Sequence, residues 1–106
     1  MMDARTLADL AREQEDGGRP YFEFIRCQSM SVGLYVLEAG AVDKQSPHFE
    51  DEIYIVLEGH SRFTAGNRTR DAGPGDTISV PAGVPHRFHD ITEKLRVIVA
   101  FAPPET

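Results

Sequence analysis

Three residues of this chain, His48, Glu52 and His86, are of the types that bind transition metals. Two imidazoles and one carboxylate suit one divalent ion of Fe, Mn, Ni, Co or Zn, and they leave coordination positions open for a substrate or water. Residues an even number apart in a strand project from one face, which would place His48 beside Glu52. We therefore expect a single metal cofactor, provided that the fold brings His86 to the same place from a distant strand.

The elements that must position these residues read mainly as short strands. Runs rich in aromatic and β-branched residues are separated by Gly, Pro and Asp, which is typical of an all-β sandwich or barrel. Before them, residues 3–14 predict a short helix, capped by Asp3 or Thr6 and ended by Gly17 and Gly18. A tight turn is expected at Gly66. The expected strands are 21–26, 29–37, 52–58, 61–65, 68–72, 76–80, 87–91 and 95–101.

The residues from Gly40 to Gly59 resemble the first sequence motif of the cupin family. That motif runs from a Gly through five residues to His-x-His, then through three or four residues to Glu, and through six more to a second Gly. Gly40, His48, Glu52 and Gly59 occupy the matching positions. The first His of the pair falls at position 46, which is Ser46.

The residues from Gly75 to Asp90 resemble the second cupin motif, a Gly followed by Pro-x-Gly, a His and an Asn. Gly75, Pro81, Gly83 and His86 match, and Asp90 stands in place of the Asn. The resemblance implies a single-domain cupin, an all-β jelly-roll barrel, with a short N-terminal helix. We expect residues 1–20 to form the helix and a turn, and residues 21–106 to form the barrel domain. The family pattern also implies that His48, Glu52 and His86 are the metal ligands.

Ser46 reduces the four-ligand site that is common in the family to three ligands, because a serine hydroxyl binds these metals poorly at neutral pH. Gln45, beside the vacant position, and Glu50, with the same parity as His48, are candidates for an extra ligand. The remaining set of two His and one carboxylate resembles the facial triad of non-haem Fe(II) oxygenases. Tyr54 and Phe88, each two residues after an expected ligand, are the candidates for lining a small-molecule pocket.

Several other side chains have a structural interpretation. We expect Cys27 to be a small buried apolar residue and Glu50 and Asp51 to be exposed loop charges. His60 should be solvated, and His89 should face away from the site because its parity is opposite to that of His86. The expected core includes Tyr54, Phe88, Phe63, Phe101, Tyr35 and Met30.

Two functions of different classes are consistent with such a site. One is a metal-dependent enzyme of oxygenase, isomerase or lyase type that acts on a small molecule, which we prefer because the ligand set leaves positions open. Its weakness is the lack of a convincing general base beyond Glu50 and Tyr54. The other is a non-catalytic module that binds or senses a small molecule or metal, which the loss of a ligand at Ser46 favours. A fold alone does not decide between them.

Composition narrows the partners. Eleven Lys and Arg against 17 Asp and Glu give a net charge of −6, which argues against nucleic acid and anionic membranes as partners. The charged residues at the start argue against a secretory signal, and a single cysteine needs no oxidising compartment, so we expect a cytoplasmic protein. The run 52–58 is apolar on both faces, with Ile53, Ile55 and Leu57 outward if Glu52 points inward. Either a second layer within the chain or a partner subunit would cover this outer face, and we prefer a homodimer because the chain is small.

Overall fold

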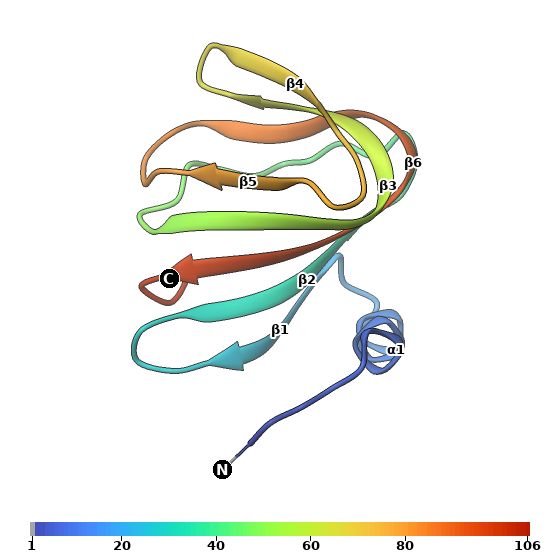
Figure 1. Cartoon of the computed structure of the whole chain (residues 1–106), viewed down its shortest axis with the longest axis vertical. Coiled ribbons are helices and arrows are strands. Elements are labelled where there is room, and N and C mark those ends of the chain that lie inside the picture. The colour runs from blue at the N-terminus through green and yellow to red at the C-terminus, as the bar shows by residue number, and fades with distance from the viewer. Residues whose placement is uncertain (1) are drawn as a thin grey trace.

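The computed structural model describes residues 2–106, which form one helix and six strands (Figure 1). The strands pair antiparallel in the order β1–β2–β6–β3–β4, and β5 pairs with the first part of β3. The sheet curls around a core without closing on itself (Figure 1). The predicted all-β class with a short N-terminal helix is confirmed. In chain order the elements are α1 (Leu7–Gly17), β1 (Tyr21–Arg26), β2 (Ser31–Leu37), β3 (Asp51–Ala65), β4 (Arg68–Ala72), β5 (Thr77–Val80) and β6 (His86–Ala102).

Two long bent strands, β3 and β6, replace four of the predicted short ones. They pair along most of their length, with register shifts between Val56 and Arg62 that bend both strands. Gly59 sits at this bend with φ 91°, and a Cβ there would lie less than 3.0 Å from the backbone carbonyl of Lys94. Sequence periodicity showed a break at this point, which is a bulge within one strand and not a loop between two. The tight turn predicted at Gly66 is confirmed, since Ala65 pairs with Arg68 across it.

Helix α1 begins four residues later and ends three residues later than predicted. Thr6 caps it, because its hydroxyl accepts a hydrogen bond from the Asp9 backbone N–H while the Asp9 carboxylate accepts one from Thr6. The other candidate cap, Asp3, lies outside the helix. The chain leaves the helix at Gly18 with φ 71°, a conformation that glycine adopts at low cost. The helix packs its buried Leu10 against the outer face of the sheet, near Leu34 and Val36.

The core lies inside the curl of the sheet. Tyr54, Phe63, Phe88 and Phe101 are buried there, as predicted, and Tyr35 packs against the cluster. Two other expectations are wrong: Cys27 is exposed, and Met30 is 41% exposed. Both belong to the turn between β1 and β2, where the Cys27 N–H donates to the Met30 carbonyl at 3.0 Å. This turn extends past the edge of the core, so its side chains are solvated whatever their type.

The outer face of β3 is only partly covered. Ile53 and Ile55 point outward, as predicted, and are 41% and 39% exposed, while Leu57 is packed against the cluster under α1. In register with them on β6 lie Ala100 and Ile98. Within the described residues, no helix combines the length and apolar character that crossing a bilayer requires.

Candidate metal centre

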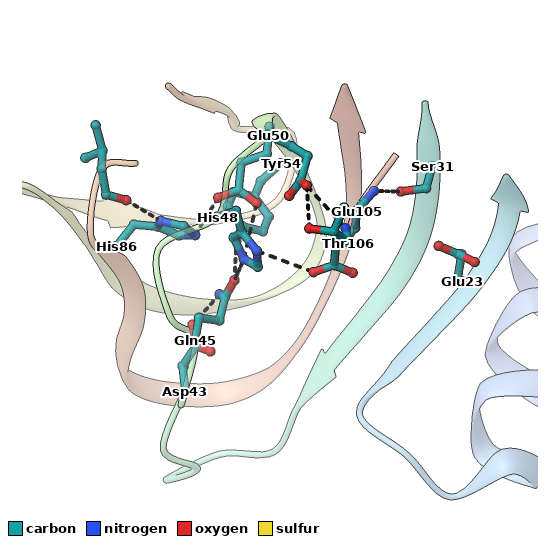
Figure 2. Close-up of polar contacts among 12 residues, drawn as sticks. Glu23, Ser31, Asp43, Gln45, His48, Glu50, Tyr54, His86, Glu105 and Thr106 are labelled. Atoms are coloured by element: carbon teal, nitrogen blue, oxygen red, sulfur yellow. Dashed lines mark hydrogen bonds and ion pairs between the residues drawn. The ribbon is translucent and has the colours of Figure 1, made fainter. Parts of the chain in front are cut away.

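Three side chains from separate elements meet inside the curl of the sheet, and Figure 2 shows two of them, His48 and His86. His48 lies in the segment before β3, Glu52 is near the start of β3, and His86 is the first residue of β6. Each offers one ligand atom, and these atoms all lie within 4.8 Å of one another. His48 is not part of a strand, so the even spacing to Glu52 is not what brings the two together. The irregular chain before Asp51 folds His48 back over Glu52 instead.

Both nitrogens of each histidine face oxygen atoms that can only accept hydrogen bonds. His86 has its Nδ1 at 2.8 Å from the Val84 carbonyl and its Nε2 against Oε1 of Glu52. His48 has its Nδ1 at 3.4 Å from Oε2 of Glu105 and its Nε2 at 3.2 Å from Oε1 of Gln45. A neutral imidazole carries one N–H and satisfies one such partner. The second nitrogen of each ring therefore needs either a second proton or a metal ion.

The burial of Glu52 and His86 bears on the choice between a proton and a metal ion. The side chains of Glu52 and His86 are each 1% exposed, and the rings of His48 and His86 have centroids 5.4 Å apart. Two imidazolium ions at this separation and burial would repel each other and lose their hydration. One divalent ion, bound by both rings and by the carboxylate, would take the place of both inner protons. The donor set therefore fits a metal better than it fits two extra protons.

The atoms at the centre have unused bonding capacity. Among residues 2–106, neither carboxylate oxygen of Glu52 nor Nε2 of His86 has a hydrogen-bond partner of acceptable geometry, although Glu52 and His86 touch. Leaving buried charged groups unsatisfied in this way is costly, and a metal that binds all three atoms removes the cost. Burial alone would lower the pKa of His86, but the Glu52 carboxylate and the Val84 carbonyl outweigh burial and raise it.

Gln45 lies beside His48, with its amide oxygen 3.2 Å from Nε2 of that residue. Its Nε2 donates to the Asp43 carboxylate at 2.7 Å, which fixes the orientation of the amide, because a carboxylate accepts and cannot donate. The amide oxygen then faces His48 and accepts a hydrogen bond from the Tyr54 hydroxyl at 2.8 Å. Ser46, at the vacant motif position, is exposed. Of the two candidates for an extra ligand, Gln45 is thus the one whose oxygen faces the centre.

Glu50 has a different role from either expectation. It is 3% exposed and not a solvated loop charge, and its Oε2 accepts hydrogen bonds from the backbone N–H and hydroxyl of Thr106. Asp51 is exposed, as predicted, and accepts from the Ala82 N–H at 2.9 Å. Glu50 therefore holds the segment after β6 against the site. Because its Oε2 is used in this way, Glu50 is a poorer candidate for a metal ligand than Gln45.

A cavity of about 170 Å³ opens beside His48. Tyr54 lines it, as expected, but Phe88 is fully buried in the core behind Tyr54 and is not part of the lining. Burial, with the Glu52 charge, raises the pKa of Tyr54 far above its ordinary value, and its hydroxyl donates to Gln45, so Tyr54 does not act as a base. The lining residues are Tyr21, Tyr35, Gln45, His48, Tyr54, Val99, Phe101 and Glu105.

The remaining histidines lie outside the site. His60 is largely exposed and pairs with Glu93 at 3.4 Å. His89 faces Thr64 on β3, with its Nε2 at 2.7 Å from the Thr64 hydroxyl, and its Nδ1 contacts Asp90. Both positions agree with the sequence-based expectations.

Comparison with known proteins identifies the family. A family model described as a cupin domain matches residues 33–101, which is more than half of the chain. The chain is a cupin. The match spans the stretch from β2 to the end of the sheet, and so includes all three candidate ligands.

The relatives of this cupin include characterised and uncharacterised proteins. An uncharacterised protein of Streptomyces coelicolor is 46% identical over 105 residues, covering 99% of this chain and 100% of that one. The acireductone dioxygenase of Danio rerio is 28% identical over 104 residues, covering 86% of this cupin and 55% of the enzyme, so the cupin spans about half of that relative. A crystal structure of a protein from Thermus thermophilus superposes with a TM-score of 0.77 at 24% identity, covering 97% and 99% of the two chains, and this likeness shows the fold alone.

Sequence reasoning missed several residues that shape the cupin site. Asp43 is buried and accepts hydrogen bonds from the Tyr35 hydroxyl, the Gln45 amide and the Phe88 backbone N–H. Glu105, beyond the second motif, faces His48. Neither position is marked by spacing or composition. The partners of Asp43 are up to 45 residues away in the chain, and those contacts exist only once the sheet has folded.

Proposed function

We propose that this cupin is a metal-dependent enzyme that acts on a small molecule, with one divalent ion held by His48, Glu52 and His86 and with the Gln45 amide oxygen as a fourth ligand. The observation that carries the proposal is the pairing of buried His86 with half-buried His48, whose ring nitrogens all face acceptors, beside a buried carboxylate without hydrogen-bond partners among the described residues. A metal bound there would supply Lewis-acid or redox chemistry at the wall of the cavity.

Oxygenase chemistry is the first choice among the three reaction types. Two histidines and one carboxylate with open positions are the ligand set of non-haem Fe(II) oxygenases. A relative of this cupin is named as a dioxygenase, and the alignment covers 86% of the chain. Isomerase and lyase reactions use the same open positions and come second. The aromatic and apolar lining of the cavity would keep bulk water away from the reacting atoms.

Oxygen consumption tests the enzyme proposal. Protein is loaded with Fe(II) under anaerobic conditions and then mixed with oxygenated buffer. It should consume oxygen in the presence of at least one member of a panel of small carbonyl and hydroxyl compounds. Glu52→Gln should abolish the consumption, whereas His60→Gln, which alters an exposed imidazole outside the site, should keep it. If metal binds but no redox, isomerase or lyase turnover appears with any first-row ion, the enzyme proposal fails.

A non-catalytic binding module is the second candidate function. The absence of a histidine at Ser46 favours it, because the family's full ligand set is reduced. In that case the metal would hold a ligand in the cavity without converting it. The same loaded protein would then bind small molecules with no turnover.

We also propose that two copies of the cupin pair through the outer face of β3 and β6. A groove of about 250 Å³ lies there between Met30, Ile53 and Ala102, and the exposed Ile55 extends the apolar surface along β3. Burying this surface in a second copy would stabilise the pair by the hydrophobic effect. Light scattering should show a dimer that Ile53→Glu dissociates and that Thr69→Glu, on exposed β4, leaves intact. A monomer at every concentration contradicts the proposal.

The expected location stays a proposal as well. We propose that the protein works in the cytoplasm, since Cys27 is an exposed free thiol that a reducing compartment would preserve. Cell fractionation with an antibody against the chain would test this.

A further inference from the structure

Two side chains in the cavity have polar groups that the protein does not fully use. The Tyr21 hydroxyl is buried and has no hydrogen-bond partner among residues 2–106. Glu105 faces His48 with its Oε2 at 3.4 Å, which occupies one carboxylate oxygen and leaves the other able to accept a hydrogen bond. The other two tyrosine hydroxyls in the lining already donate, that of Tyr35 to Asp43 and that of Tyr54 to Gln45. A ligand in this cavity would therefore be recognised by Tyr21 and Glu105.

Both groups are held in place by the fold. The Tyr21 ring lies across Gly33 of β2, where a Cβ would come within 3.0 Å of the ring atoms. Glu105 is fixed through its backbone, since its N–H donates to the Ser31 hydroxyl at 2.9 Å and its carbonyl accepts from Arg26 at 3.0 Å. Figure 2 shows the Glu105 side chain turned toward His48 from the segment after β6. The two recognition groups are thus pre-positioned, which lowers the entropy cost of binding.

The size of the cavity limits the ligand. An apolar cavity of about 150 Å³ holds a molecule of the size of benzene. The cavity here, at about 170 Å³, has room for a similar number of non-hydrogen atoms. Drug-sized ligands occupy pockets of roughly 300–1,000 Å³, so large substrates such as nucleotides or oligosaccharides do not fit inside.

The charge of the cavity limits the ligand further. In the part of the chain that the structure describes, no Lys or Arg lines the cavity, while Glu105 does and Glu52 lies at the centre. A divalent ion would be neutralised by these two carboxylates. A phosphate ester or a dicarboxylate would then bring buried negative charge without a partner, which is strongly unfavourable. An uncharged ligand with hydroxyl groups meets no such penalty.

We propose that this cavity binds a small uncharged molecule of about six non-hydrogen atoms. The molecule presents a hydroxyl group to Tyr21 and Glu105, and it directs a second oxygen atom toward the metal centre at His48. The proposal rests on the proposed metal centre and adds the class of ligand to it. It also assigns discrimination against phosphorylated and dicarboxylic analogues to Glu105. Tyr21 recognises the hydroxyl group and is not needed for metal binding.

Two probes of matched shape and one larger, charged probe test the proposal on metal-loaded protein by calorimetry. Dihydroxyacetone has six non-hydrogen atoms and two hydroxyl groups, pentan-3-one replaces both hydroxyls with methyl groups, and dihydroxyacetone phosphate adds a dianion. We expect dihydroxyacetone to bind more tightly than the other two. Tyr21→Phe should weaken dihydroxyacetone about 3- to 10-fold, the effect of one lost hydrogen bond, and should leave pentan-3-one unchanged. Glu105→Gln should reduce the difference in affinity between dihydroxyacetone and its phosphate. His60→Gln serves as the control outside the cavity.

Metal content, measured on the same samples, separates this proposal from the one that it rests on. Protein that holds one metal ion per chain but prefers pentan-3-one or the phosphate overturns the ligand class and leaves the metal centre standing. If Tyr21→Phe retains its metal but loses affinity equally for all three probes, Tyr21 has a structural role, and this result also overturns the proposal. Protein that takes up no metal overturns both.

Discussion

Removing the Asp43 carboxylate should destabilise the fold more than any exposed substitution would. Asp43 is 5% exposed, and its two oxygens accept three hydrogen bonds, from Tyr35 at 2.7 Å, from Gln45 at 2.7 Å and from the Phe88 backbone at 2.9 Å. The residue joins the segment before β3 to β2 and β6. Asp43→Ala leaves one buried and two partly buried donors without their acceptor, and it also frees the Gln45 amide to turn.

The size of the effect follows from these contacts. A hydrogen bond to a charged group is worth about 1.5–3 kcal/mol, so the three together amount to about 4.5–9 kcal/mol. The cost of burying the carboxylate offsets part of this, and removing one partner of a buried charged network has a net cost of about 3–5 kcal/mol. Asp43→Asn keeps an oxygen for two of the donors and should cost about 1–2 kcal/mol. A domain of this size has a total stability of about 5–15 kcal/mol.

Urea unfolding of the metal-free protein measures both variants against the wild type. Asp71→Ala is the matched control, because the Asp71 side chain is 85% exposed and pairs with Arg62 at the surface, where such pairs contribute about 0.2–1 kcal/mol. The expected order of destabilisation is Asp43→Ala, then Asp43→Asn, then Asp71→Ala. A loss below about 1 kcal/mol for Asp43→Ala would refute the idea that Asp43 organises the site.

Three further predictions concern the bend, the pH dependence and the thiol. Gly59→Ala should unfold the protein or cost about 3 kcal/mol or more of its stability. The new Cβ would meet the Lys94 backbone, and the φ of 91° is strained for alanine. If the variant resisted urea as well as the wild type does, the tight bend at Gly59 would be contradicted. The raised pKa of His86 means that its contribution to metal-free stability is present below its unfolded pKa of about 6.5 and is lost as pH rises through the folded pKa. The thermal unfolding temperatures of metal-free wild type and His86→Gln should therefore converge as pH rises. Metal-loaded wild type should instead become more stable as pH rises, because fewer protons compete with the metal for the histidine nitrogens. Unfolding temperatures of the two metal-free proteins that stay equally far apart at every pH would argue against this role of His86. Contacts with Ser29 lower the pKa of the exposed Cys27 thiol, so it should react with a thiol reagent in the folded state, and a requirement for denaturant would show that it is buried.

Much of the fold was predictable because local patterns determine it. The strand-forming runs and the turn at Gly66 depend on neighbouring residues, and the structure has them. Of the two predicted helix caps, Asp3 and Thr6, the structure has Thr6. The break at Gly59 was visible too, but sequence alone did not show whether it was a loop or a bulge. That depends on how β6 runs alongside, which is a contact across more than thirty residues.

The site was predictable where the motifs carry it. The match to the two family motifs grouped His48, Glu52 and His86, and the structure brings their ligand atoms within 4.8 Å of one another, although the metal itself stays a prediction. Asp43 and Glu105 were missed because their importance comes from partners that are distant in the chain. Cys27 was misjudged because residue type predicts burial on average, whereas this residue lies in a turn that leaves the core.

Elemental analysis of the untagged protein tests the central claim most directly. Wild type, and the control His60→Ala, should hold close to one iron, manganese, nickel, cobalt or zinc ion per chain. His48→Ala and His86→Ala, if folded by circular dichroism, should hold none. Wild type that is free of metal and takes up none on titration would contradict the account, and so would His86→Ala that retains a full complement of metal.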